Sequence, residues 1–165
     1  MEEFKNIASN GNSHNKQNRI LRAKWMDYRS PSIMMVTIVT TKRLPLLGKL
    51  QGENIILTEL GQKVAEEIKR IPTYNGAESI EIYSYVIMPD HVHILLHIHE
   101  HLPRHVGYYI RWLKKQCTNI GLALAVPSAS DHSPLFAPDY HDRILKGKNQ
   151  LSHMVRYIQD NPRRL

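Results

Sequence analysis

The sequence predicts an α+β protein with the split βαβ arrangement, in which an antiparallel sheet carries helices on one face and a further helix follows at the C-terminal end. Two observations support this fold class. Stretches with strand and helix periodicity follow one another in the order β-α-β-β-α-β-α, which is typical of this arrangement. The 165 residues, 42% of them hydrophobic, are enough for one domain with a single core.

A flexible polar arm is expected before this domain, over residues 1–30. The segment is rich in Asn and lacks apolar periodicity, so residues 1–18 at least are expected to be flexible. Its basic residues, Arg22 among them, are interpreted as part of a solvated tail rather than as contacts to phosphate. Residues 31–165 form the predicted domain.

The first strand and the first helix follow from two kinds of periodicity. Residues 33–41 are apolar on both alternating faces, which predicts a strand inside the sheet rather than at its edge. Residues 57–70 carry an apolar stripe at helical spacing, and Thr58 is a suitable N-cap. A connection that contains Pro and Gly is predicted between the two elements.

A pair of strands is predicted next, over residues 80–88 and 91–99, because Pro89 and Asp90 between them favour a turn. The remaining predicted elements are a helix over 104–118, a loop rich in Pro, Ser and Ala over 121–138, a short strand over 142–145 and a final helix from about Gln150.

The charge balance favours a polyanionic partner. Lys and Arg number 22 against 15 Asp and Glu, for a formal charge of +7 and a pI near 9.6. A basic surface releases condensed counterions when it binds nucleic acid. Many small proteins are basic without such a partner, so charge alone does not decide the class of ligand.

The cysteine content and the lack of long apolar runs indicate in which cellular compartment the protein is expected. Cys117 is the only cysteine, so the chain forms no intramolecular disulfide and no CxxC zinc site. No stretch approaches the roughly 20 apolar residues that span a bilayer, and the N-terminus lacks the pattern of a signal peptide. We therefore expect a cytoplasmic protein without a membrane partner.

Alternate side chains of the strand predicted over residues 91–99 lie on opposite faces of the sheet. Every second position from Val92 to Ile98 is apolar, as expected for a face covered by helices. The other face carries Leu95 and four histidines, His91, His93, His97 and His99. Imidazoles at i and i+2 are close enough to share one divalent metal ion. Solvated histidines are the alternative, since H-x-H alone is a weak motif. A metal site here would be open, as catalytic sites are.

The final helix places a tyrosine beside its apolar stripe. Apolar residues from Leu151 to Ile158 recur at helical spacing, and Tyr157 lies to one side of them with Asn161 four residues further on. A phenol with a free pKa of about 10 needs activation to act as a nucleophile. An ordinary amphipathic helix is the alternative. Pro162 disfavours helical geometry at Asn161, which could be only a C-terminal cap.

Three segments resemble motifs of the HUH single-tyrosine transposases. The run YVIMPDHVHILL at residues 85–96 resembles the signature of that family. The segments YHDRIL at residues 140–145 and VRYIQDNP at residues 155–162 resemble its branch of tyrosine transposases associated with REP sequences. The three motifs occur in the expected order and together extend the resemblance over residues 33–162.

The resemblance implies a ferredoxin-like fold and a site for Mg²⁺ or Mn²⁺ built from His91 and His93, with Asn161 in the position of a polar third ligand. It also implies that Tyr157 cleaves single-stranded DNA at a hairpin or repeat end. The 5′-phosphotyrosine link so formed frees a 3′-hydroxyl and conserves the phosphodiester energy, so rejoining needs no nucleotide cofactor. Relatives include dimers, and the resemblance leaves a monomer and a homodimer both open.

Basic side chains are expected to contact the DNA backbone. Those nearest the proposed site are Arg143, Lys146, Lys148 and Arg156, and the helix over 104–118 adds Arg111 and Lys115 beside exposed aromatic residues. Cations beside exposed aromatics suit single-stranded nucleic acid. They suit a protein–protein interface as well.

Three functions remain open on these grounds. The first is a metal-dependent, single-stranded DNA transesterase that uses the histidine pair and Tyr157. The second is a domesticated, non-catalytic DNA-binding module of the same fold, which would not need to keep those residues. The third is a metal-storing protein that uses the histidines of residues 91–101, and its metal affinity would not depend on Tyr157.

Overall fold

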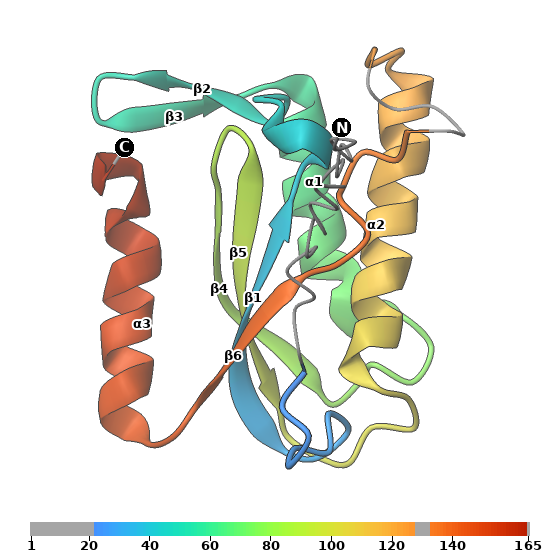
Figure 1. The fold of residues 1–165 in the computed structure, drawn as a ribbon, viewed down its shortest axis with the longest axis vertical. Coiled ribbons are helices and arrows are strands. Elements are labelled where there is room, and N and C mark those ends of the chain that lie inside the picture. Colours follow the sequence, from blue (N-terminus) through green and yellow to red (C-terminus); the bar gives the residue numbers. More distant parts are fainter. Residues whose placement is uncertain (1–21, 128–132, 165) are drawn as a thin grey trace, which may run out of the picture.

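A four-stranded antiparallel sheet runs through the middle of the molecule (Figure 1). In the computed structural model, which describes residues 22–127 and 133–164, the strand order is β4-β5-β1-β6. The strands are β1 (Ser32–Val39), β4 (Ile80–Ile87), β5 (His91–Ile98) and β6 (His141–Leu145). Because β5 lies between β1 and β4, which a helix joins in sequence, this is the predicted split βαβ arrangement. The α+β fold class is confirmed.

Two helices cover one face of this sheet (Figure 1). They are α1 (Glu59–Arg70) and α2 (Val106–Ala123), and the main core lies between them and the sheet. Val92, Ile94 and Leu96 of β5 are fully buried in that core. The face of β5 that the sequence assigned to the helices is therefore confirmed. At roughly 1.5–3 kcal/mol for each fully buried aliphatic side chain, this core is the main source of stability.

A third helix, α3 (Lys148–Asp160), covers the opposite face of the sheet (Figure 1). It packs through a second, much smaller core made of Leu95, Leu145, Met154 and Ile158. Leu95 is fully buried there, although it shares a face of β5 with the histidines. The histidine face is thus not simply open to solvent, because α3 covers its middle.

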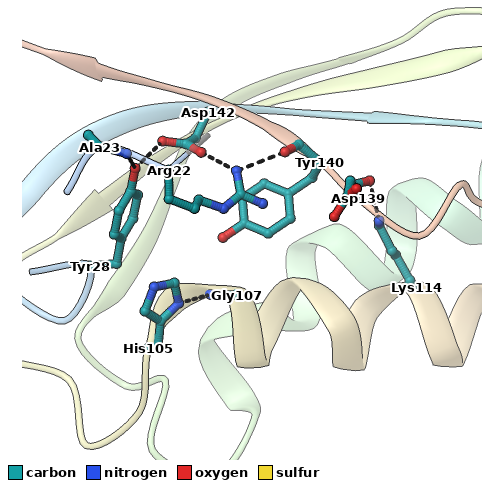
Figure 2. Close-up of polar contacts among 9 residues, drawn as sticks. All are labelled: Arg22, Ala23, Tyr28, His105, Gly107, Lys114, Asp139, Tyr140 and Asp142. Atoms are coloured by element: carbon teal, nitrogen blue, oxygen red, sulfur yellow. Dashed lines mark hydrogen bonds and ion pairs between the residues drawn. The ribbon is translucent and has the colours of Figure 1, made fainter. Parts of the chain in front are cut away.

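The N-terminal segment differs from the predicted flexible arm in its described part, residues 22–30. Tyr28 is buried in the main core, and its hydroxyl donates to the Asp142 carboxylate at 2.7 Å. Arg22 forms an ion pair with the same carboxylate, and its guanidinium lies over the ring of Tyr140 at 3.6 Å (Figure 2). Arg22 is therefore not part of a solvated tail. Residues 1–21 of the predicted arm lie outside the described residues.

A hairpin that the sequence analysis did not predict precedes α1. It consists of β2 (Gly48–Gln51) and β3 (Asn54–Leu57), which form a separate two-stranded sheet. Gly52 in its turn has a φ of 61°, a conformation that glycine adopts without strain. Each strand has only four residues, too few for an alternation of apolar and polar residues to reveal it in the sequence.

Helix ends depart from the predicted ranges by a few residues. Thr58 caps α1 as predicted, since its hydroxyl accepts the N–H of Gly61. α2 begins at Val106 rather than at residue 104, and it runs to Ala123, into the predicted loop over 121–138. α3 begins two residues before the predicted start, directly after Gly147. No helix in the described ranges is long and apolar enough to cross a membrane.

Candidate active site

The turn between β4 and β5 gives the histidine strand a fixed starting point. Two backbone N–H groups from outside the turn donate to its carbonyls, Leu47 to Pro89 at 3.0 Å and Thr40 to Asp90 at 2.9 Å. Thr40 is itself buried. Asp90, the residue before His91, is therefore held in place by hydrogen bonds from Thr40, which directly follows β1.

The two histidines of the HUH motif lie side by side at the start of β5. His91 pairs with Val39 of β1 and His93 with Thr37, so both side chains lie on the same face. Their ring centroids are 4.8 Å apart, and the ring planes make an angle of 75°. The shared face that strand alternation predicts is thus present in the structure.

Each ring has a partner at its Nδ1 atom. Asp90 Oδ1 lies 2.6 Å from His91 Nδ1, and Thr37 Oγ1 lies 2.7 Å from His93 Nδ1. The other oxygen of Asp90 accepts a hydrogen bond from Arg43 at 3.0 Å. When Nδ1–H donates to such an oxygen, the ring is fixed in orientation and its Nε2 keeps a lone pair for another ligand.

Burial also sets the protonation of the site. Burial, and after it the neighbouring His91, lowers the pKa of His93 to about 4, and the side chain is only 7% exposed. Burial raises the pKa of Asp90, but hydrogen bonds from His91 and Arg43 outweigh it and leave this pKa below its ordinary value. At neutral pH, His93 is therefore a neutral imidazole, the form that binds metals, beside an ionised carboxylate.

α3 brings Tyr157 to the histidine pair. The ring centroids of Tyr157 and His93 are 5.7 Å apart, in an edge-on arrangement at 63°. Tyr157 is half-buried and packs against the small core beneath α3. This contact joins two motifs that neither strand nor helix periodicity could bring together.

Asn161 follows α3 and starts the 3-10 turn η3 (Asn161–Arg164). It is the C-terminal cap of α3, the alternative that the sequence left open, and its dihedral angles, φ −56° and ψ −42°, are helical although the following Pro162 disfavours that geometry. The side chain is 7% exposed, and its Nδ2 has no hydrogen-bond partner among the described residues. Rotation about the last side-chain bond would put Oδ1 in that place. A buried amide group with one unpartnered atom fits the chemistry of a metal ligand, provided that its oxygen takes that position.

A family model settles which proteins this chain is related to. The model described as "Transposase IS200 like" matches residues 53–161. The chain belongs to the IS200-like transposase family. The resemblance seen in the sequence motifs is thereby confirmed, and the matched stretch contains the histidine pair, Tyr157 and Asn161.

Individual proteins are similar to this chain in sequence or in fold. An uncharacterized protein of Haemophilus influenzae is 24% identical over 87% of each chain. A REP-associated tyrosine transposase solved with a REP hairpin has a TM-score of 0.60 and 19% identity, over 86% of this chain and 73% of that one. A Deinococcus radiodurans protein assigned to the transposases has a TM-score of 0.52 and 20% identity, over 84% of this chain and 97% of its own. These two structures share the fold of this chain.

The basic residues proposed for DNA contact fall into two separate groups. The first group is exposed on β6 (Arg143), on α3 (Lys148 and Arg156) and on the connection between the two elements (Lys146). Arg111 and Lys115 are exposed on α2, which covers the other face of the sheet. In both groups a lysine lies over an exposed indole, Lys146 over Trp25 at 4.7 Å and Lys115 over Trp112 at 5.8 Å. The two helices involved, α3 and α2, cover opposite faces of the sheet (Figure 1).

Sequence reasoning missed the residues that hold the imidazoles of the transposase. Asp90 could have been noticed, because metal-binding histidines commonly donate their other ring N–H to a carboxylate and Asp90 directly precedes His91. Thr37 could not, because its place opposite His93 depends on the register of β1 against β5. His97 and His99 were considered only as ligands of a metal-storing protein, and Glu81, which the structure groups with them at the other end of β5, was not considered.

Proposed function

We propose that this transposase is a metal-dependent, single-stranded DNA transesterase that cleaves and rejoins DNA through a 5′-phosphotyrosine. The observation that carries the proposal is the contact between Tyr157 and His93, with ring centroids 5.7 Å apart. It sets a candidate nucleophile beside a pair of oriented imidazoles. A hairpin or repeat end is the proposed substrate, supported by the structural relative that was solved with a REP hairpin.

The proposed chemistry divides between a bound ion and the side chains of the chain itself. His91, His93 and Asn161 would hold Mg²⁺ or Mn²⁺, which when bound draws charge from a phosphate oxygen. The phenol of Tyr157 gives its proton to solvent and its oxygen bonds to phosphorus, while the P–O3′ bond breaks and the leaving 3′-oxygen takes a proton from solvent. The DNA then has a free 3′-hydroxyl, and the 5′-phosphate stays on Tyr157. Attack by a 3′-hydroxyl on the same phosphorus reverses the step and rejoins the strand.

Neighbouring side chains support this chemistry without touching the substrate. Thr37 and Asp90 fix the two rings at Nδ1, which leaves the Nε2 of each ring for the metal. Arg43 in turn holds Asp90. These three are positioning residues, and their loss should weaken metal affinity before it affects DNA binding.

The two basic groups are proposed to contact different parts of the DNA. Arg143 belongs to the face of the sheet that α3 covers, since it pairs with Met35, which pairs with Leu95. Arg143, Lys146, Lys148 and Arg156 are therefore assigned to phosphates close to the reacting bond. Arg111 and Lys115, on α2, are assigned to a second and more distant stretch of the strand.

The proposal is tested by an assay for a covalent adduct between the protein and DNA. The protein is incubated with Mg²⁺ or Mn²⁺ and a pool of labelled single-stranded hairpin oligonucleotides, and the products are separated under denaturing conditions. We expect a labelled protein band that Tyr157→Phe abolishes. Tyr83→Phe is the matched control, since Tyr83 is an exposed phenol on β4 outside the site. An adduct that survives Tyr157→Phe would mean that another residue is the nucleophile. DNA binding without any adduct would favour the non-catalytic module.

A second experiment asks whether one copy of the chain is sufficient. Tyr157 contacts His93 of its own chain, which supports a site that a single copy completes. A mixture of Tyr157→Phe with the double variant His91→Ala, His93→Ala is therefore expected to form no adduct. Recovery of the adduct in the mixture would show that the tyrosine serves the site of another copy.

A further inference from the structure

Three possible metal ligands gather at the end of β5 that is remote from the HUH pair. Glu81 of β4 pairs directly with His97 of β5, and His99 follows two residues later. The N–H of His99 donates to the carbonyl of Ser79 at 2.9 Å, which continues the pairing of the two chain segments past the end of β5. The register of two strands therefore sets all three side chains next to one another.

The distances within this cluster suit a small divalent ion. Glu81 Oε2 lies 2.8 Å from His99 Nε2 and 3.7 Å from His97 Nδ1, and the two imidazole centroids are 3.9 Å apart. One ligand atom from each residue can be chosen so that all lie within 4.8 Å of one another. Around a tetrahedral ion with bonds near 2.1 Å, ligand atoms are about 3.4 Å apart. Small rotations of these partly exposed side chains would bring the cluster to that spacing.

The donor set selects the class of metal. Two imidazoles and one carboxylate suit zinc, nickel, copper and cobalt, whereas magnesium prefers oxygen ligands. All three side chains are accessible to solvent, so water could complete the coordination. No residue is shared with the HUH pair, and the carboxamide of Asn161 is not involved.

We propose that Glu81, His97 and His99 form a second metal site, which binds a divalent transition-metal ion of the zinc class and ties the end of β5 to β4. The site is independent of the transesterase proposal, because it uses none of the residues assigned to that reaction. The competing explanation is a plain ion pair, in which the carboxylate only hydrogen-bonds with His99 and lies near His97.

Calorimetric titration of the metal-free protein with Zn²⁺ separates the two explanations. To remove the HUH pair, the titration uses the double variant His91→Gln, His93→Gln, with circular dichroism as a check on folding. We expect saturable binding in this background. Adding Glu81→Gln should weaken it by at least roughly tenfold, the lower end of what the loss of even an outer partner of a ligand costs. Adding His97→Gln with His99→Gln should abolish it.

His101→Gln is the matched control, because this exposed histidine lies two residues beyond His99 and outside the cluster. It should leave the Zn²⁺ affinity unchanged. The proposal is overturned if the double variant shows no saturable binding, if Glu81→Gln has no effect, or if His101→Gln removes the binding.

Thermal unfolding gives a second readout, which would detect binding even if the heat of binding were small. Excess Zn²⁺ should raise the Tm of the double variant, because the ligands come from two strands and meet only in the folded state. It should not raise the Tm once His97 and His99 are also replaced. Glu81→Gln alone should still form the DNA adduct with Mg²⁺, so the two proposals can fail separately.

Discussion

Replacing Leu95 by Ala is expected to release α3 from the sheet while the rest of the domain stays folded. Leu95 and Leu96 are neighbours in β5 and both are fully buried. Leu95 faces the small core under α3, whereas Leu96 faces the main core under α1 and α2. The two positions therefore allow the same chemical change to be made on opposite faces of one strand.

The size of the expected effect depends on the docking free energy of α3, to which few buried side chains contribute. On the helix itself only Met154 and Ile158 are buried, and each contributes about 1.5–3 kcal/mol when fully buried. Their sum, about 3–6 kcal/mol before losses of entropy, is close to the roughly 2–5 kcal/mol that a buried Leu→Ala change removes. Leu95→Ala should thus cancel most of the docking free energy of α3. Leu96→Ala should lower global stability by a similar amount.

Hydrogen exchange distinguishes these outcomes by location. In Leu95→Ala, the amides of α3 should exchange much faster while those of β1 and β5 keep most of their protection. In Leu96→Ala, protection should fall throughout the sheet. Adduct formation should drop strongly only in Leu95→Ala under conditions where both variants are folded, because Tyr157 would leave His93. Uniform loss of protection in Leu95→Ala, or unchanged exchange in α3, would refute the idea that this small core docks the helix.

Three further predictions concern single positions. Thr37→Val removes the oxygen 2.7 Å from His93 Nδ1, and a metal titration of adduct formation should shift to roughly 10–100-fold higher Mn²⁺; an unchanged titration would remove Thr37 from the site. Gly61→Ala would place a Cβ 1.9 Å from the Leu47 carbonyl oxygen. Urea unfolding should therefore show a free energy of unfolding lower by about 1–3 kcal/mol, despite the better helix propensity of Ala. A higher free energy of unfolding would contradict this packing. In metal-free protein, unfolded His93 takes up its proton near pH 6.5 but the folded side chain only near pH 4, so stability should fall as the pH drops through this window, by at most about 3 kcal/mol. His93→Gln should lose that part of the pH dependence. If the free energy of unfolding fell equally steeply with pH in both proteins, His93 would not be its source.

The elements that the sequence predicted well are those whose signal is local. Side chains two apart in a strand share a face whatever surrounds them, so the two faces of β5 were predictable from residues 91–99 alone. The spacing of the α1 stripe and its cap at Thr58 are local in the same sense. The fold class followed because the order of such elements leaves few topologies.

The features that the sequence did not reveal depend on contacts between distant segments. Tyr157 reaches His93 only because α3 docks on the histidine face, and Thr37 reaches it only through the register of β1. Tyr28 lies in a polar segment without periodicity, yet its partner Asp142 is 114 residues further along the chain. Periodicity within a single element carries no information about such pairs.

The contacts of residues 22–30 also decide where a stable fragment of this protein can begin. The carbonyls of Arg29 and Tyr28 accept the N–H groups of Leu102 and Val106 at 2.8 and 3.1 Å. A fragment cut at residue 31 would strip these donors of their partners and expose the main core. One cut at residue 53, where the family match starts, would also lack β1, the strand between β5 and β6. Expression for biochemical work should therefore start no later than Arg22.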